Sequence, residues 1–194
     1  MTMQAIHAAA ASAANPALRR DAAHGCSLLR MAVGNDAVAV AIDDVREILE
    51  VGRLTALPRT PDFVRGVMNL RGAVVPVIDL MARLGQAPAQ IGRRSCVVVV
   101  ETAALADADD DAQADDEHAA GHGSDSLVVG LLVDAVYEVF DAPAGEFEPV
   151  PPLGTSIDPS FLLGMSRVRN EVIGVLALDR VLAQHELTAL IGQQ

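Results

Sequence analysis

The chain has 194 residues, enough for one domain or two small ones with a buried core. Hydrophobic residues make up 51% of it, but aromatic residues only 3%, so the core must consist of Val, Leu, Ile and Ala. No apolar run approaches the roughly 20 residues that a membrane helix needs, which excludes direct membrane insertion by such a helix.

The formal charge of −12 is concentrated in one part of the chain. Nine of the 26 acidic residues lie within residues 101–126, which contain no arginine or lysine, so the remainder is close to neutral. The 14 basic residues are all arginine and are scattered along the chain. This distribution argues against a nucleic-acid-binding surface.

Residues 1–24 are rich in alanine, and the basic pair Arg19-Arg20 follows the alanine run instead of preceding it. This order does not match a secretion signal, so we expect a disordered tail on a cytoplasmic protein. Two short apolar runs, 26–33 and 37–42, then predict strands joined by a turn. Residues 43–50 do not follow the two-residue periodicity of a strand. Val45, Ile48 and Leu49 fall on one helical face, which predicts a short helix.

Residues 60–63 predict a single helical turn with Thr60 as its cap and Pro61 at its first position. Gly66 would end this turn, where a left-handed residue is favoured. A β-hairpin follows, with 66–70 returning as 73–78. Gly72 would supply the positive φ of a type II bend or a glycine bulge, a role that does not require the neighbouring Arg71. Pro76 predicts a sheet edge or a bulge, because proline cannot donate a ladder hydrogen bond. Asp79 is the candidate cap of one more helical turn, at 80–85.

Further strands are expected at 95–101, 126–134 and 136–140, and a final hairpin at 165–179. Residues 102–125, between the first two, are highly charged without β periodicity, which predicts a disordered acidic insertion. Residues 179–192 predict a closing amphipathic helix. Eight to ten short strands with helices only at the corners are typical of a mainly β fold, a barrel or a sandwich.

The sequence offers little evidence of catalysis or of a metal. Asp115, Asp116, His118 and His122 could ligate a divalent ion loosely, but the EF-hand spacing fails because its central glycine and terminal glutamate are missing. His185 has no evident Ser or Cys partner. Cys26 and Cys96 are far apart and predict neither a metal site nor a disulfide framework. We therefore expect no enzyme and no cofactor, and keep a metal-dependent enzyme using the insertion as the weaker alternative.

Four segments of the chain resemble the CheW family of chemotaxis coupling proteins: AIDDVREIL (41–49), LPRTPDFVRGVMNLRGAVVPVIDLMARLG (57–85), VGLLVDAVYEVF (129–140) and VIGVLALDRVL (172–182). The resemblance implies a CheW-like domain over residues 25–192, interrupted by the acidic insertion. It also implies two interleaved five-stranded SH3-like β-barrels with short corner helices and a C-terminal helix.

The resemblance further implies a non-catalytic adaptor in cytoplasmic chemosensory arrays at the membrane. Its partners would be the cytoplasmic tip of a methyl-accepting receptor and the regulatory domain of a CheA-type histidine kinase. The family's receptor-side positions fall on Val45, Glu47, Gly66 and Arg71. A paralogous scaffold for a non-flagellar pathway, such as twitching pili, remains the alternative within the same class.

Overall fold

The computed structural model describes residues 26–103, 126–142, 147–150 and 156–182. The tail, residues 104–125 of the acidic insertion with its candidate metal ligands, and His185 lie outside these ranges. Thr102 and Ala103, which were expected in the insertion, belong to the strand before it. Ten strands form two five-stranded sheets, which confirms the mainly β fold class. Their bounds are β1 Cys26–Val33, β2 Asp36–Ala41, β3 Val45–Glu50, β4 Val64–Leu70, β5 Ala73–Asp79, β6 Cys96–Ala103, β7 Ser126–Val133, β8 Ala135–Ala142, β9 Leu162–Val168 and β10 Glu171–Leu176.

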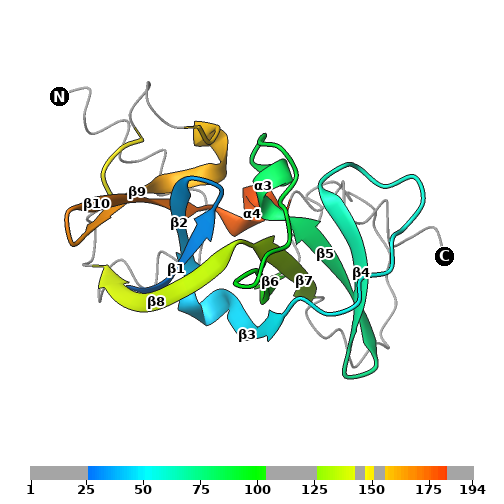
Figure 1. The fold of residues 1–194 in the computed structure, drawn as a ribbon. Coiled ribbons are helices and arrows are strands. Elements are labelled where there is room, and N and C mark those ends of the chain that lie inside the picture. The colour runs from blue at the N-terminus through cyan, green and yellow to red at the C-terminus, as the bar shows by residue number, and fades with distance from the viewer. Residues whose placement is uncertain (1–25, 104–125, 143–146, 151–155, 183–194) are drawn as a thin grey trace, which may run out of the picture.

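The two sheets are interleaved along the chain and lie side by side (Figure 1). The first has the order β8-β1-β2-β10-β9, and the second has the order β3-β6-β7-β5-β4. The second sheet is therefore inserted between β2 and β8 of the first. Two short helices, α3 (Leu80–Arg83) and α4 (Leu178–Val181), lie next to each other between the sheets (Figure 1). No helix in the described part of the chain is long and apolar enough to cross a membrane.

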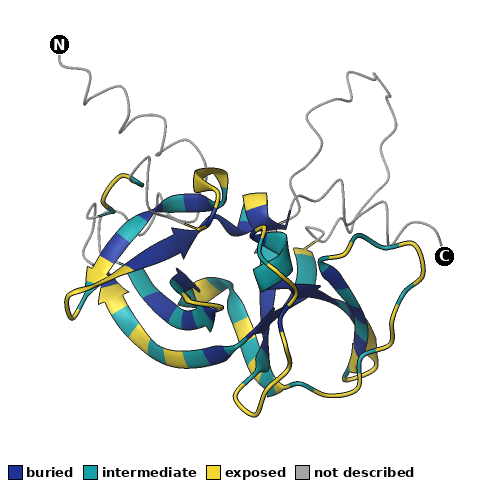
Figure 2. Cartoon of the chain, turned by 45° about the horizontal axis from the view of Figure 1, so that its top comes forward, coloured by how far each residue is buried: buried dark blue, intermediate teal, exposed yellow. Residues whose placement is uncertain are grey.

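Three apolar clusters hold the fold together, and exposed residues gather at hairpin tips and loops (Figure 2). The largest lies between the sheets and includes Met31, Ile78 and Leu131. Each sheet also curves around a cluster of its own, with Val97 in one and Ile173 in the other. Because alternate residues of a strand face opposite sides, strands such as VVVV at 97–100 supply both the central and the sheet's own cluster.

The predicted helix at 43–50 is wrong. Residues Ile42–Asp44 form one 3₁₀ turn, and Val45–Glu50 form strand β3, in which inward and outward residues alternate. Ile48 therefore lies on the face opposite Leu49 and is 45% exposed. The apolar residues of VREIL fit both the periodicity of a helix and that of a strand, and pairing with β6 stabilises the strand.

The predicted hairpin is confirmed as β4 and β5, with Leu70 opposite Ala73. Its two-residue turn differs from the expected type II bend or bulge, because Arg71 (φ 53) and Gly72 (φ 92) both have positive φ. This is the type I′ geometry that matches the twist of a hairpin. The expected edge or bulge at Pro76 is wrong: β5 is an interior strand between β7 and β4, and Pro76 pairs with Val67 in regular register. Pro76 lies just before residues 77–79, which pair with β7, so its missing N–H falls outside that parallel ladder.

Two smaller expectations also need correction. Residues 61–64 form one hydrogen-bonded turn, from Val64 N to Pro61 O, but the Thr60 hydroxyl donates to Leu57 O instead of capping it. Gly66 does not end that turn: it is buried within β4 at φ 133. Asp79 caps α3 as predicted, accepting from Ala82 N. Of the predicted closing helix, only the first turn, α4, is within the described residues.

The two sheets are related by an internal repeat that sequence analysis did not detect. Both place one parallel pair next to the hairpin, β2 with β10 and β7 with β5. Both edge strands β3 and β8 carry a bulge against their partner, and so do β4 and β9. Both hairpins turn through two residues of positive φ, Arg71-Gly72 and Arg169-Asn170. One supersecondary pattern is thus used twice.

Candidate functional site

Arg71 stands at the tip of the β4–β5 hairpin with its side chain 81% exposed. The tip is held by other groups, since Gly72 N donates to Asn69 Oδ1 at 2.9 Å. A non-glycine residue in the left-handed region costs on the order of 1 kcal/mol, and Asn or Gly would suit this turn better. The arginine therefore does not improve the turn in which it lies.

Glu47 is the partner of Arg71, and the structure brings these two predicted residues together. One guanidinium nitrogen of Arg71 lies 3.2 Å from a carboxylate oxygen of Glu47. Glu47 belongs to β3, at the bulge opposite β6, and its side chain is only 24% exposed. The pair joins the edge strand β3 to the turn that follows the other edge strand of the second sheet, β4.

Val45 and Gly66 occupy different surroundings. Val45 is separated from Glu47 by the bulge in β3, so it faces the opposite side of the sheet from Glu47 and packs against the central cluster. Gly66 is buried where the chain at Thr55 crosses β4, with Thr55 and Val67 joined by two backbone hydrogen bonds. A Cβ at Gly66 would lie 2.2 Å from Thr55 O. Close backbone contact thus accounts for the glycine.

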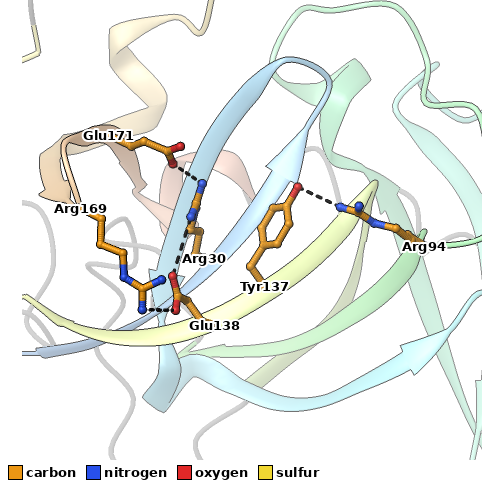
Figure 3. A network of polar contacts seen from close by, with 6 residues as sticks. All are labelled: Arg30, Arg94, Tyr137, Glu138, Arg169 and Glu171. Carbon is orange, nitrogen blue, oxygen red and sulfur yellow. Dashed lines mark hydrogen bonds and ion pairs between the residues drawn. The ribbon is translucent and has the colours of Figure 1, made fainter.

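The internal repeat places a second arginine–glutamate pair at the end of the first sheet. Arg169 occupies the same turn position as Arg71, and it lies 3.1 Å from Glu138 of the edge strand β8 (Figure 3). Here Arg30 of β1 also reaches Glu138, at 3.8 Å, and pairs with Glu171. In the second sheet the residue opposite Glu47 is Val99, so the Arg71 pair has no such additional cation. The repeated strand patterns in the sequence could have revealed this pair.

Exposed apolar side chains mark the edge strands β3 and β8. Ile48 is 45% exposed, and Tyr137 and Val139 are each 50% exposed. Cys96 links the strands, because it pairs with Glu50 of β3 and hydrogen-bonds to the backbone of Val136 in β8. Burial raises the pKa of the Cys96 thiol, and neither Cys26 nor Cys96 is in a disulfide. The second sheet thus combines an exposed ion pair, whose arginine can exchange its carboxylate partner, with an edge strand that carries an exposed apolar side chain. Such a surface is suited to binding another protein.

No group of three or more His, Cys, Asp or Glu residues within the described ranges is placed to hold a metal. The Arg71–Glu47 pair is suited to binding a partner's polar groups. The exposed guanidinium can form paired hydrogen bonds to a carboxylate or to backbone carbonyls, while Glu47 fixes its direction.

The comparisons with known proteins agree with the motif resemblance. A family model described as CheW-like domain matches residues 27–186. Chemotaxis protein CheW of Rhizobium meliloti (strain 1021) is 32% identical over 165 residues, covering 85% of this chain and 92% of the relative. Protein FrzA of Myxococcus xanthus is 32% identical over 152 residues, covering 77% of this chain and 81% of the relative.

The same likeness is present in three dimensions. The crystal structure of scaffolding protein TtCheW from Thermoanaerobacter tengcongensis matches with a TM-score of 0.62 and 28% sequence identity, over 78% of this chain and 84% of that one. Because the family model spans all ten strands apart from one terminal residue, the chain belongs to the CheW-like domain family.

Proposed function

We propose that this chain is a non-catalytic adaptor that couples methyl-accepting chemoreceptors to a CheA-type histidine kinase, in the cytoplasm at membrane-associated arrays. CheW-family coupling proteins work with chemoreceptors and CheA in general, and the proposal extends that role to this chain. The receptor-side surface would include Arg71, Glu47 and Val45, with Gly66 shaping the strand beneath them. The kinase would bind through its regulatory domain.

The observation that supports this proposal most strongly is Arg71 itself. It is exposed, it sits in a backbone conformation that favours other residues, and Glu47 orients its guanidinium. Stability does not explain an arginine there, because exposed ion pairs contribute about 0–1 kcal/mol. Local departures from the favoured residue are typical of functional positions.

The test is a reconstituted array of receptor, kinase and this protein. Arg71→Ala should change the free energy of unfolding by less than about 1 kcal/mol, yet sharply reduce receptor control of kinase activity. Lysine at position 71 should rescue only part of the control, because it lacks the planar fork of arginine. Arg71→Asn provides the stability control, since asparagine suits the left-handed turn. If all three variants keep full receptor control, the proposal fails.

A second candidate is a paralogous scaffold of a non-flagellar pathway. This chain is as similar to Protein FrzA as to the Rhizobium CheW, at 32% identity to each, so identity does not favour one pathway. Deleting the gene and scoring swimming and surface motility separately would decide between them. Loss of swimming control alone supports the first candidate, and loss of surface motility alone supports the second.

A further inference from the structure

The internal repeat allows the β9–β10 hairpin of the first sheet (the first hairpin) and the β4–β5 hairpin of the second sheet (the second hairpin) to be compared position by position. In both sheets the glutamate of the arginine–glutamate pair lies at a bulge of the edge strand, β8 or β3. Aligning the registers at these bulges places Arg30 of β1 at the position of Val99 of β6. Counting from the two-residue turns places Glu171 at the position of Ala73. The two hairpins therefore share one backbone pattern but differ by two charged residues.

The two charged residues of the first hairpin are bound to each other. Arg30 pairs with Glu171 and also lies 3.8 Å from Glu138, as Figure 3 shows. Its guanidinium lies 5.0 Å from the centroid of the Tyr137 ring, and its side chain is only 20% exposed. Its Nε is buried and has no hydrogen-bond partner among the described residues. A partner that drew Glu171 away would therefore leave a buried cation with still fewer acceptors.

The second hairpin is apolar at both of these positions. Ala73, at the position of Glu171, is exposed. The next residue, Val74, is 66% exposed, whereas its equivalent Val172 is 46% exposed. The second hairpin thus presents its turn arginine beside an exposed apolar strand end, and the first hairpin presents its turn arginine beside a carboxylate.

A partner that covers either hairpin must remove water from the groups beneath it. At the second hairpin it would cover the alkyl groups of Ala73 and Val74 and could pair with the exposed guanidinium of Arg71. At the first hairpin it would also remove water from the carboxylate of Glu171, whose side chain is 59% exposed. Burying a charge without a new partner is costly. A partner fitted to the second hairpin would therefore bind the first one more weakly, although the two backbones are alike.

We propose that the Arg30–Glu171 ion pair is a specificity determinant that restricts the receptor to the second hairpin, because it makes the otherwise equivalent first hairpin unfavourable for the same partner. The inference rests on the proposed adaptor function, in which the receptor binds at Arg71. It assigns a role in partner selection to two residues outside the receptor-side surface. A chain that uses one supersecondary pattern twice can in this way distinguish its two ends.

The test is calorimetric titration of the full chain with a coiled-coil-fused cytoplasmic tip fragment of a chemoreceptor from the same genome. The double variant Arg30→Val with Glu171→Ala gives the first hairpin the side chains that the second has at these positions. It should raise the stoichiometry from one bound fragment per chain to two. Adding Arg169→Ala should return the stoichiometry to one, because it removes the turn arginine of the new site.

The converse change is made on the exposed second hairpin, where the fold is not at risk. Ala73→Glu gives this hairpin the carboxylate of the first and should weaken binding about tenfold or more. Ala73→Gln is the matched control, since it adds a side chain of the same size without the charge. It should weaken binding by a clearly smaller factor than Ala73→Glu.

Thermal unfolding shows first whether the double variant is folded. A folded double variant that still binds one fragment overturns the inference, and so does a second site that persists after Arg169→Ala. Equal binding by Ala73→Glu and Ala73→Gln also overturns it, and this comparison decides alone if the double variant does not fold. In each of these cases the proposed function stands as long as Arg71→Ala weakens binding to the parent chain's site. If Arg71→Ala binds the fragment as tightly as the parent does, the proposed function itself fails.

Discussion

Asp79 has no exposed surface, and its carboxylate organises the chain around it. Oδ1 accepts from Ala82 N at 3.1 Å and caps α3, while Oδ2 accepts from Ala89 N at 2.8 Å. Arg65 lies 3.5 Å away and also donates to Ala89 O, so the loop that leads to Arg94 is fixed at this point. The sequence predicted the cap, but a cap alone does not require full burial.

We expect Asp79→Ala to lower the free energy of unfolding by about 2–4 kcal/mol, because it leaves the buried Ala89 amide, the partly buried Ala82 amide and Arg65 without their acceptor. Asp79→Asn keeps one acceptor oxygen and should cost less. Chemical denaturation of both variants measures this, with the exposed Asp62→Ala as control, expected within about 0.5 kcal/mol of the parent. Equal stability of Asp79→Ala and Asp62→Ala would contradict the role assigned to Asp79.

At the scale of the element, strand β3 and the predicted helix differ in where they place the side chains of Ile48 and Leu49. A helix puts both on one apolar face, whereas the strand puts Ile48 outside and Leu49 against the second sheet's cluster. Ile48→Lys should therefore change stability by less than about 0.5 kcal/mol. Leu49→Lys should cost about 2 kcal/mol or more, because it buries part of a charge and removes apolar contact. Similar thermal unfolding of the two variants would favour the helix.

The β6–β7 hairpin carries the acidic insertion, and its strands remain paired as far as Ala103 and Ser126. Hydrogen bonds from Ser126 and Arg46 lower the pKa of Glu101 and hold this end of the ladder. Replacing residues 106–124 by a short glycine-containing turn should shift Tm by less than about 3 °C, because closing a longer loop costs only about 0.6 kcal/mol per doubling of its length. Scanning calorimetry checks this expectation. Loss of a single cooperative transition would show that the insertion packs against the sheets.

At the scale of the whole molecule, Arg83 joins the two repeats. Its guanidinium lies over Phe63, at 4.6 Å, and over Phe161, at 5.3 Å, which precede the equivalent strands β4 and β9. Its Nε donates to Val181 O at the end of α4, 2.6 Å away. One side chain at the end of α3 thus contacts both halves of the repeat where α3 and α4 meet.

Arg83→Lys should lower stability by about 1–2 kcal/mol, because lysine cannot stack flat between two rings and donate from a fork. The exposed Arg53→Lys provides the matched control and should have little effect. A double-mutant cycle with Phe161→Leu measures the coupling across the repeat. Additive effects of Arg83→Lys and Phe161→Leu would show that the stacking contributes nothing.

The sequence by itself determined nine of the ten strand segments, the hairpin at Arg71, the cap at Asp79 and the family. These features follow from local patterns: alternating apolar residues, a turn glycine, and a motif with fixed spacing. It also indicated Arg71 and Glu47 as receptor-side candidates, through the family motif.

Only the tertiary structure decided the remainder, because the decisive contacts join residues far apart in the chain. Pairing with β6 made 45–50 a strand, although its pattern fits a helix equally well. Two positive φ values at the tip followed from the twist of the hairpin, which requires the type I′ turn. The repeat of the Arg71–Glu47 pair at Arg169–Glu138, and the hydrogen bond from Arg94 to Tyr137, depend on how the strands are ordered in space. Local periodicity carries no information about that order, since sheet neighbours are selected by long-range burial and pairing.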